Sequence, residues 1–263
     1  MQNLWTLKAL PDKNIVFALQ ECLGVSELVA TLLAQRGIET FEEAKQFFRP
    51  QLSDLYNPFL MKDMDKAVER LHRAINSNEK ILVYGDYDVD GTTAVSLMYL
   101  FLKEKCKHVE YYIPDRYDEG YGVSYQGIDY AKRNNFSLII CLDCGIKAVE
   151  KVAYARNKDV DFIICDHHRP GDTLPLAVAV LDPKRSDCDY PFKELCGCGV
   201  GFKLAQAYHQ QYNLPFEDLV PLLDLVVVSI AADIVPMIDE NRVLSFYGLK
   251  QLNASPRIGL KAL

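Results

Sequence analysis

The chain has 263 residues, of which 49% are hydrophobic and 25% are charged, and its formal net charge is -7. These values are those of an ordinary globular protein, and no apolar stretch approaches the roughly 20 residues that a membrane-spanning helix needs. The acidic balance argues against a protein that simply coats nucleic acid, although bound divalent cations would offset part of that charge.

We expect a cytoplasmic protein with no membrane association. The first residues lack the basic and then apolar order of a signal peptide. The eight cysteines fit a reducing compartment better than a disulfide scaffold, because several lie in or beside apolar, strand-like runs. A zinc site is the alternative, but Cys-x-Cys is poor spacing for a zinc knuckle; its ligands would be Cys141, Cys144, Cys196 and Cys198.

Residues 1–75 are predicted to form a helical N-terminal segment. Apolar residues recur at helical spacing over 26–36, and this run ends at Gly37, a residue type that commonly terminates helices. Thr40 and Glu43 have the spacing of a capping box. A further amphipathic helix is predicted over 64–75.

Residues 76–252 are predicted to form an α/β domain. Short apolar runs rich in branched residues alternate with helical stretches, which indicates a parallel five-stranded sheet with helices on both faces. The predicted strands are 81–84, 109–113, 138–142, 162–165 and 177–181, and the helices between the first four are 92–105, 125–134 and 146–157.

Acidic residues cluster directly after three of these predicted strands. Three aspartates follow the first strand in YGDYDVDG (84–91), Asp143 follows the third, and the sequence DHH (166–168) follows the fourth. Because the carboxyl ends of parallel strands meet at one edge of a sheet, we expect these groups to converge. Crowded carboxylates repel one another unless cations compensate, and carboxylates with neutral imidazoles suit the divalent metals of phosphoryl chemistry. The pattern therefore predicts a metal-dependent phosphoesterase.

The aspartate-rich motif has two other interpretations. A calcium loop starting at Asp86 needs a bidentate glutamate at its twelfth position, where this chain has Leu97. A haloacid-dehalogenase-like phosphatase would use Asp88 as the nucleophile and Asp90 as the general acid. That second interpretation leaves Asp86 and the paired histidines without a role.

Four other positions each have more than one interpretation. Asp143 either caps the following helix or binds a metal. Asp233 lies in an apolar segment, where an isolated carboxylate is costly, so we interpret it as a metal ligand. Arg116 follows the second predicted strand and would contact a phosphate or form a surface salt bridge. The glycines of GCGVG (197–201) lack the spacing of a dinucleotide loop and indicate tight packing or close backbone approach.

Four segments together resemble the motifs of the DHH phosphoesterase superfamily. They are YGDYDVDG (84–91), the aspartate of LDCG (142–145), DHH (166–168) and AADIVP (231–236). The resemblance to the single-stranded-DNA-specific exonucleases of that superfamily extends further, through residues 33–38, 113–122 and 197–203. Since those enzymes have a second core domain, we interpret 253–263 as the start of a linker helix to a domain outside this sequence. We therefore expect a truncated catalytic fragment.

The resemblance implies a two-ion site for Mn²⁺ or Mg²⁺, with Asp143 bridging the ions. The implied ligands are Asp86 and Asp88 for the first ion, and Asp90, His167 and Asp233 for the second. The implied catalytic residues are Asp90, Asp143, His167 and His168. The expected phosphate contacts are His168, Arg116 and the helix that starts at Thr92.

By the same resemblance, the whole enzyme would degrade single-stranded DNA from 5′ to 3′ in DNA repair and recombination. Single-strand-binding protein and a helicase would be its partners, and a narrow basic or stacking groove would select single strands. The alternative is a relative that hydrolyses short oligonucleotides or cyclic dinucleotides, because it would share all four motifs. A non-enzymatic relative should have lost metal carboxylates, and none is missing here.

Overall fold

The computed structural model describes residues 6–263, and the chain divides into two compact units. The first unit ends at Asp54 and the second runs from Leu55 to Leu263. The division lies before the sequence-based boundary at residue 75. The reason is helix α4 (Met64–Asn76), whose buried face packs against the sheet and a later helix of the second unit.

The first unit is a small helical assembly. Apolar residues, including Leu19, Ala30 and Ala44, are buried between its helices. The predicted capping box is confirmed, because the Glu43 N–H donates to the Thr40 hydroxyl and the Thr40 N–H donates to the Glu43 carboxylate. The elements of this unit are α1 (Lys13–Leu23), α2 (Glu27–Ala34), α3 (Phe41–Phe48) and the short 3-10 helix η1 (Leu52–Asp54).

Within residues 6–263, no single helix is both long and apolar enough to cross a membrane. Helices α1 and α2 reach that length and composition only when they are taken together, and the chain bends by 120° between them.

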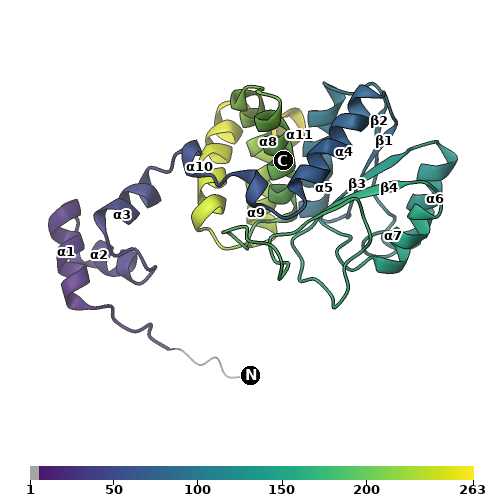
Figure 1. Cartoon of the computed structure of the whole chain (residues 1–263). Helices are drawn as coiled ribbons and strands as arrows, with labels where there is room; N and C mark the ends of the chain where they lie inside the picture. The colour runs from purple at the N-terminus through teal and green to yellow at the C-terminus, as the bar shows by residue number, and fades with distance from the viewer. Residues whose placement is uncertain (1–5) are drawn as a thin grey trace. The chain divides into compact units, whose positions relative to one another are not determined.

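The second unit is built on a parallel sheet of five strands, within residues 55–263, which confirms the predicted fold class (Figure 1). The strand order is β2-β1-β3-β4-β5. Strand β2 is therefore added on one side of β1, and β3, β4 and β5 are added on the other. The register pairs Tyr84 with Cys141 and Leu142 with Cys165. The strands are β1 (Ile81–Gly85), β2 (Val109–Tyr112), β3 (Leu138–Leu142), β4 (Asp161–Cys165) and β5 (Ala179–Leu181).

Helices cover both faces of the sheet (Figure 1). Alternate strand residues such as Tyr84 and Ile139 pack against α6 (Tyr125–Arg133) and α7 (Val149–Arg156) on one face. The opposite face is covered by α4, α5 (Val89–Lys103) and α8 (Gly197–Gln211). Because both faces are buried, the central strands are continuous apolar runs, as parallel sheets require.

The C-terminal helices pack around α5 and α8. A fully buried ion pair connects α8 to α10, since the Lys203 ammonium lies 2.9 Å from the Glu240 carboxylate and donates to the Tyr56 carbonyl at 2.8 Å. The remaining elements are η2 (Pro58–Leu60), η3 (Phe216–Leu222), α9 (Leu223–Ala232), α10 (Asp239–Ala254) and α11 (Ile258–Ala262). This packing fixes the start of α8 and the end of α9 near the sheet.

Two helices begin at residues other than those predicted. Helix α5 begins at Val89 rather than Thr92, because the Asp88 side chain accepts the Gly91 N–H and caps the helix earlier. Helix α7 begins at Val149 rather than at residue 146, because Gly145 has a φ of 112° and the chain turns before the helix starts.

Candidate metal centre

The sheet brings the acidic motifs together at its carboxyl edge. Strands β1 and β3 are neighbours at the point where the strand order reverses, which is where ligands bind in open α/β sheets. Asp86 is the first residue after β1, Asp143 the first after β3, and Asp166 the first after β4. The predicted convergence of these three segments is therefore observed.

Asp143 is the most constrained of these carboxylates. It is 1% exposed, and its backbone is in the left-handed region, with a φ of 58°. Its N–H donates to the Cys165 carbonyl at 2.8 Å, which holds the turn. Neither carboxylate oxygen has a hydrogen-bond partner among residues 6–263, and α7 begins after Ala148 without a side-chain cap, so the capping interpretation of Asp143 is wrong.

Helix α8 begins in direct contact with Asp143. A Cβ atom on Gly197 would lie 2.6 Å from the Asp143 Cβ, so only glycine allows this approach. This confirms that the glycine-rich segment serves close packing, and the structure identifies the neighbour as an acidic side chain of the site.

His167 lies at the centre of the carboxylates. Its Nε2 atom is 3.2 Å from Oδ1 of Asp143, 3.5 Å from Oδ2 of Asp90 and 3.7 Å from Oδ2 of Asp233. Two groups of potential metal ligands result, each with its donor atoms within 4.8 Å of one another, and both include His167. One is Asp143, His167 and His168; the other is Asp90, His167 and Asp233.

Asp90 is held in place by three hydrogen bonds. The N–H groups of Gly197 and Cys198 each donate to it at 2.7 Å, as expected for an anion at a helix N-terminus. The Ser229 hydroxyl donates to it at 2.6 Å from helix α9. Sequence reasoning missed Ser229. The available signal was its position four residues before Asp233, which places both residues on the same face of a helix.

Asp86 and Asp88 flank this centre but belong to neither three-ligand group. Asp86 is buried, and it accepts the N–H groups of Tyr87 at 2.7 Å and Gly122 at 3.2 Å. Asp88 is exposed and caps α5 through Gly91.

The electrostatics of the centre favour a bound cation. Burial raises the pKa of Asp143 to about 10, with further contributions from the charges of Asp90 and Asp88. Burial likewise raises the pKa values of Asp86 and Asp233. Among the described residues, only histidines lie within ion-pair distance of these carboxylates. Carboxylate oxygens together with imidazole nitrogens suit Mn²⁺ or Mg²⁺, and the unpartnered oxygens of Asp143 fit such an ion.

His168 is oriented by Asp166 rather than by the other carboxylates. Its Nδ1 is 2.8 Å from Oδ1 of Asp166, which also accepts two backbone N–H groups, while the other oxygen accepts the Ile146 N–H. The hydrogen bond to Asp166 raises the pKa of His168. Burial opposes ionisation of Asp166, but the hydrogen bond from His168 outweighs it, and the pKa of Asp166 is lowered. The other ring nitrogen of His168, Nε2, lies 3.4 Å from the Tyr121 hydroxyl.

A family model described as "DHH family, N-terminal domain" matches residues 80–230, which contain every residue of the centre except Asp233. The chain belongs to the DHH family. Among curated proteins, it is 46% identical over 253 residues to the single-stranded-DNA-specific exonuclease RecJ of Bacillus subtilis, and 35% identical over 248 residues to that of Escherichia coli. These alignments cover 96% and 90% of this chain, but the chain spans only 31% and 42% of the two relatives' lengths.

Solved structures give the same result. A manganese complex of RecJ from Thermus thermophilus matches 97% of this chain and 36% of that protein, with a TM-score of 0.81 and 27% identity. A second manganese-bound RecJ exonuclease matches 81% of this chain and 52% of that protein, with a TM-score of 0.71 and 31% identity. The predicted resemblance is confirmed at the level of both sequence and fold.

Membership of the DHH family and the geometry remove the competing interpretations of the motif. A strand, not a helix, precedes Asp86, which excludes a calcium loop of the helix–loop–helix type. Both oxygens of Asp90 accept hydrogen bonds, from Gly197, Cys198 and Ser229, which does not match the general acid of a haloacid-dehalogenase-like site. No potential metal group among the described residues includes a cysteine, so the zinc interpretation has no support.

Two predicted substrate contacts lie at the rim of the centre. Arg116 makes no ion pair within residues 6–263; its guanidinium lies 5.3 Å from the centre of the Tyr87 ring, beside Asp86. Thr92 lies in the second turn of α5, and both its N–H and its hydroxyl donate to the Asp88 carbonyl. The helix whose amide end was expected at Thr92 begins instead at Val89. The expected phosphate contact at Thr92 is therefore corrected to the start of α5 at Val89.

A buried carboxylate that sequence reasoning did not identify lies next to the centre. Asp182 follows β5, is fully buried, and its Oδ2 has no hydrogen-bond partner in the described part of the chain. Burial raises the pKa of Asp182 to about 7, with a further contribution from Asp166. The only signal in the sequence was its position directly after a short apolar run.

Proposed function

We propose that this chain is the metal-binding catalytic part of an exonuclease that degrades single-stranded DNA from the 5′ end, in DNA repair and recombination. The observation that carries the proposal is Asp143, whose two buried oxygens have no hydrogen-bond partner in the described structure and belong to a cluster of potential metal ligands. The similar RecJ proteins are named as single-stranded-DNA-specific exonucleases, which supports the same substrate class.

We propose Mn²⁺ or Mg²⁺ as the cofactor, two ions in all, because RecJ crystal structures contain these metals. The proposed ligands are Asp86 and Asp88 for one ion, Asp90, His167 and Asp233 for the other, and Asp143 for both. When bound, the ions would polarise the phosphate and lower the pKa of the attacking water.

The protein's own contribution is to hold these groups ready before substrate arrives. Asp90 is fixed by its three donors, and Asp86 is fixed by two backbone N–H groups. Asp143 is aimed by its left-handed backbone and by the contact with Gly197. Groups that need no rearrangement stabilise a transition state at the least cost.

His168 is proposed to contact the scissile phosphate. Asp166 occupies Nδ1, so Nε2 is the nitrogen that remains for a phosphate oxygen. Because Asp166 raises the pKa of His168, the ring stays protonated to a higher pH and donates a charge-assisted hydrogen bond there. Arg116 is proposed to contact a neighbouring phosphate from the rim.

The whole protein would extend beyond this chain, as the RecJ proteins do. We propose that it acts in the cytoplasm, where free thiols such as the eight cysteines persist, and that single-strand-binding protein and a helicase are its partners. The groove that selects single strands would be completed outside residues 1–263.

The test combines Mn²⁺ titration by calorimetry with digestion of single-stranded DNA labelled at the 5′ or the 3′ end. We expect two bound ions and release of label from the 5′ end first. Asp143→Ala should lose metal binding and at least about 10²-fold in activity. Asp172→Ala, an exposed loop carboxylate, is the matched control and should behave like the unmodified chain.

Three results would count against the proposal. Folded protein that binds no Mn²⁺ would remove its basis, and undiminished hydrolysis by Asp143→Ala would remove the role of that residue. Hydrolysis restricted to dinucleotides or cyclic dinucleotides in a series of substrate lengths would assign the chain to the alternative phosphodiesterase class.

A further inference from the structure

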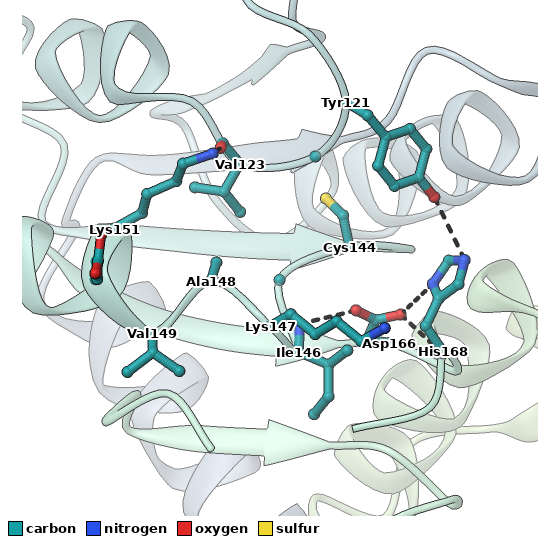
Figure 2. Close-up of a pocket in the computed structure, with 13 residues that line it drawn as sticks. Tyr121, Val123, Cys144, Ile146, Lys147, Ala148, Val149, Lys151, Asp166 and His168 are labelled. Atoms are coloured by element: carbon teal, nitrogen blue, oxygen red, sulfur yellow. Dashed lines mark hydrogen bonds and ion pairs between the residues drawn. The ribbon is translucent and has the colours of Figure 1, made fainter. Parts of the chain in front are cut away.

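A pocket of about 480 Å³ opens beside His168 and Asp166 (Figure 2). Two segments line it, residues 121–123 after β2 and residues 144–151 after β3, together with Asp166 and His168. Its volume is within the roughly 300–1,000 Å³ that is usual for small-molecule sites. That volume suits one small polar molecule rather than a run of polymer.

The pocket is continuous with the proposed reaction centre. His168 lies at one end, with Nδ1 bonded to Asp166 and Nε2 3.4 Å from the Tyr121 hydroxyl (Figure 2). His168 also belongs to one of the potential ligand groups, together with Asp143 and His167. A group bound in the pocket would therefore lie next to any phosphate that His168 contacts.

Part of the pocket wall is apolar. Ala148 and Val149 line it and are half-buried, so they retain apolar surface, whereas Val123, Cys144 and Ile146 are nearly fully buried. A site for inorganic phosphate alone would not need such walls, whereas a base and its sugar have apolar surface to bury.

Two lysines line the pocket and differ in their bonding. The ammonium of Lys151 donates to the Val123 carbonyl, which gives it a structural role. Lys147 is exposed and has no ion-pair partner within residues 6–263, and Figure 2 shows its side chain running toward the end that holds Asp166 and His168. A cation in this position complements a backbone phosphate, although Glu150 is also exposed at the rim and limits the positive field.

We infer that this pocket binds one nucleotide unit of the strand, the unit next to the cleaved phosphate. Its base and sugar lie against Ala148 and Val149, and its phosphate pairs with Lys147. The inference rests on the proposed function, and it adds a subsite for one nucleotide whose lining includes His168 but not Asp86, Asp90 or Asp143.

The experiment follows deoxythymidine 5′-monophosphate binding to the ¹⁵N-labelled chain by NMR in Mg²⁺ buffer. Parallel titrations use thymidine and inorganic phosphate. We expect the nucleotide to shift the amide signals of Val123, Ile146 and Val149. Val149→Trp fills the pocket and should raise the Kd at least ~10-fold, which corresponds to about 1.4 kcal/mol.

Lys147→Ala is the second variant and needs no change in packing. It should weaken binding of the nucleotide about 2- to 5-fold, the value of an exposed ion pair, and should leave thymidine binding unchanged. Lys107→Ala is the matched control, because Lys107 is exposed, lies just before β2 at the opposite edge of the sheet, and makes no ion pair within the described residues. It should change neither titration.

Several outcomes would overturn the inference. They are signal changes confined to the carboxylate cluster, an unchanged Kd in Val149→Trp, or inorganic phosphate producing the same shifts as the nucleotide. Calorimetry with Mn²⁺ on the same samples separates the two proposals. Normal Mn²⁺ binding without pocket binding rejects only the nucleotide site, whereas absent Mn²⁺ binding rejects the proposed function.

Discussion

The two edges of the sheet differ in the cationic partners that their acidic side chains have. At the amino edge, the Arg70 guanidinium, which is 4% exposed, lies 2.6 Å from Asp161 and 2.8 Å from Glu79. Burial of Glu79 raises its pKa, but the bonds from Ser137 and Arg70 outweigh burial and the pKa is lowered. At the carboxyl edge, the pKa values of Asp86, Asp143 and Asp233 are all raised.

This difference in partners distinguishes a carboxylate that serves the fold from a carboxylate that serves a binding site. Burial of a carboxylate that has an arginine partner in the same chain is compensated by that partner, whereas the cost of burying a carboxylate without one is relieved only by a proton or by a bound cation. Proximity of acids by itself does not separate the two cases. The presence or absence of an arginine or lysine partner does.

Removing the cation at the amino edge should have the largest effect on stability. Arg70→Ala leaves the partly exposed Asp161 and Glu79 without their buried partner, so we expect the free energy of unfolding to fall by about 2–3 kcal/mol. Mn²⁺ binding at the other edge should not change. Urea denaturation and calorimetry test both statements. Arg73→Ala, where the side chain is 62% exposed and 3.6 Å from Asp161, is the control and should cost less than about 1 kcal/mol.

Neutralising a carboxylate at the other edge should act in the opposite direction. Burial raises the pKa of Asp143 to about 10, so at pH 8 the metal-free protein must take up a proton there when it folds. Asp143→Asn removes this requirement without changing the side-chain shape, and asparagine tolerates the left-handed backbone. We expect the metal-free protein to gain about 1–3 kcal/mol of stability at pH 8 while it loses Mn²⁺ binding. Denaturation in the presence of a chelator measures the gain, with Asp172→Asn as the neutral control. A less stable Asp143→Asn variant would contradict the contrast between the edges.

A methyl group at the start of α8 should disturb the carboxyl edge without altering any charge. The Cβ of Gly197→Ala would lie 2.6 Å from the Asp143 Cβ, so we expect Mn²⁺ affinity to fall about 10- to 100-fold. Gly199→Ala is matched in helix propensity, and its Cβ would lie 3.4 Å from the nearest atom, the Cys196 sulfur. Calorimetric titration of both variants should find normal affinity only for Gly199→Ala. Equal affinities would show that the contact with Asp143 is not needed.

The pH dependence of stability should depend on Asp182. Its folded pKa of about 7 lies above the ordinary value of 3.8, so the folded state holds the proton more tightly than the unfolded state does. The stability that this provides is present below pH 3.8 and is lost as the pH rises to 7. In the unmodified protein the free energy of unfolding should fall by up to ~1.4 kcal/mol per pH unit between pH 5 and pH 7, and Asp182→Asn should remove this fall. Thermal unfolding of metal-free protein at several pH values measures this, and parallel curves for both proteins would refute it.

The sequence predicted the sheet and the convergence of the acidic segments at its carboxyl edge because both follow from local order. Branched apolar runs specify buried parallel strands, and an aspartate directly after such a run must lie at the carboxyl edge. Asp86, Asp143 and the segment 166–168 could therefore be assigned together without knowledge of any contact.

The remaining features depend on tertiary contacts that have no local signal. The start of α5 at Val89 depends on whether Asp88 caps the helix or binds an ion, and the spacing allows both. The bond from Ser229 to Asp90 joins residues 139 positions apart. The boundary at residue 54 depends on where α4 packs, and an amphipathic helix does not specify its partner.

His167 sets a limit on how the two ligand groups are filled. Its Nε2 atom is the one within ion-pair distance of Asp90, Asp143 and Asp233 in the described structure, and a ring nitrogen has a single lone pair to give. Both groups include His167, so one of them must complete its coordination without Nε2 of this residue. Two equivalent sites are therefore excluded by stoichiometry, and ions should enter in two steps of unequal affinity rather than in one doubled step.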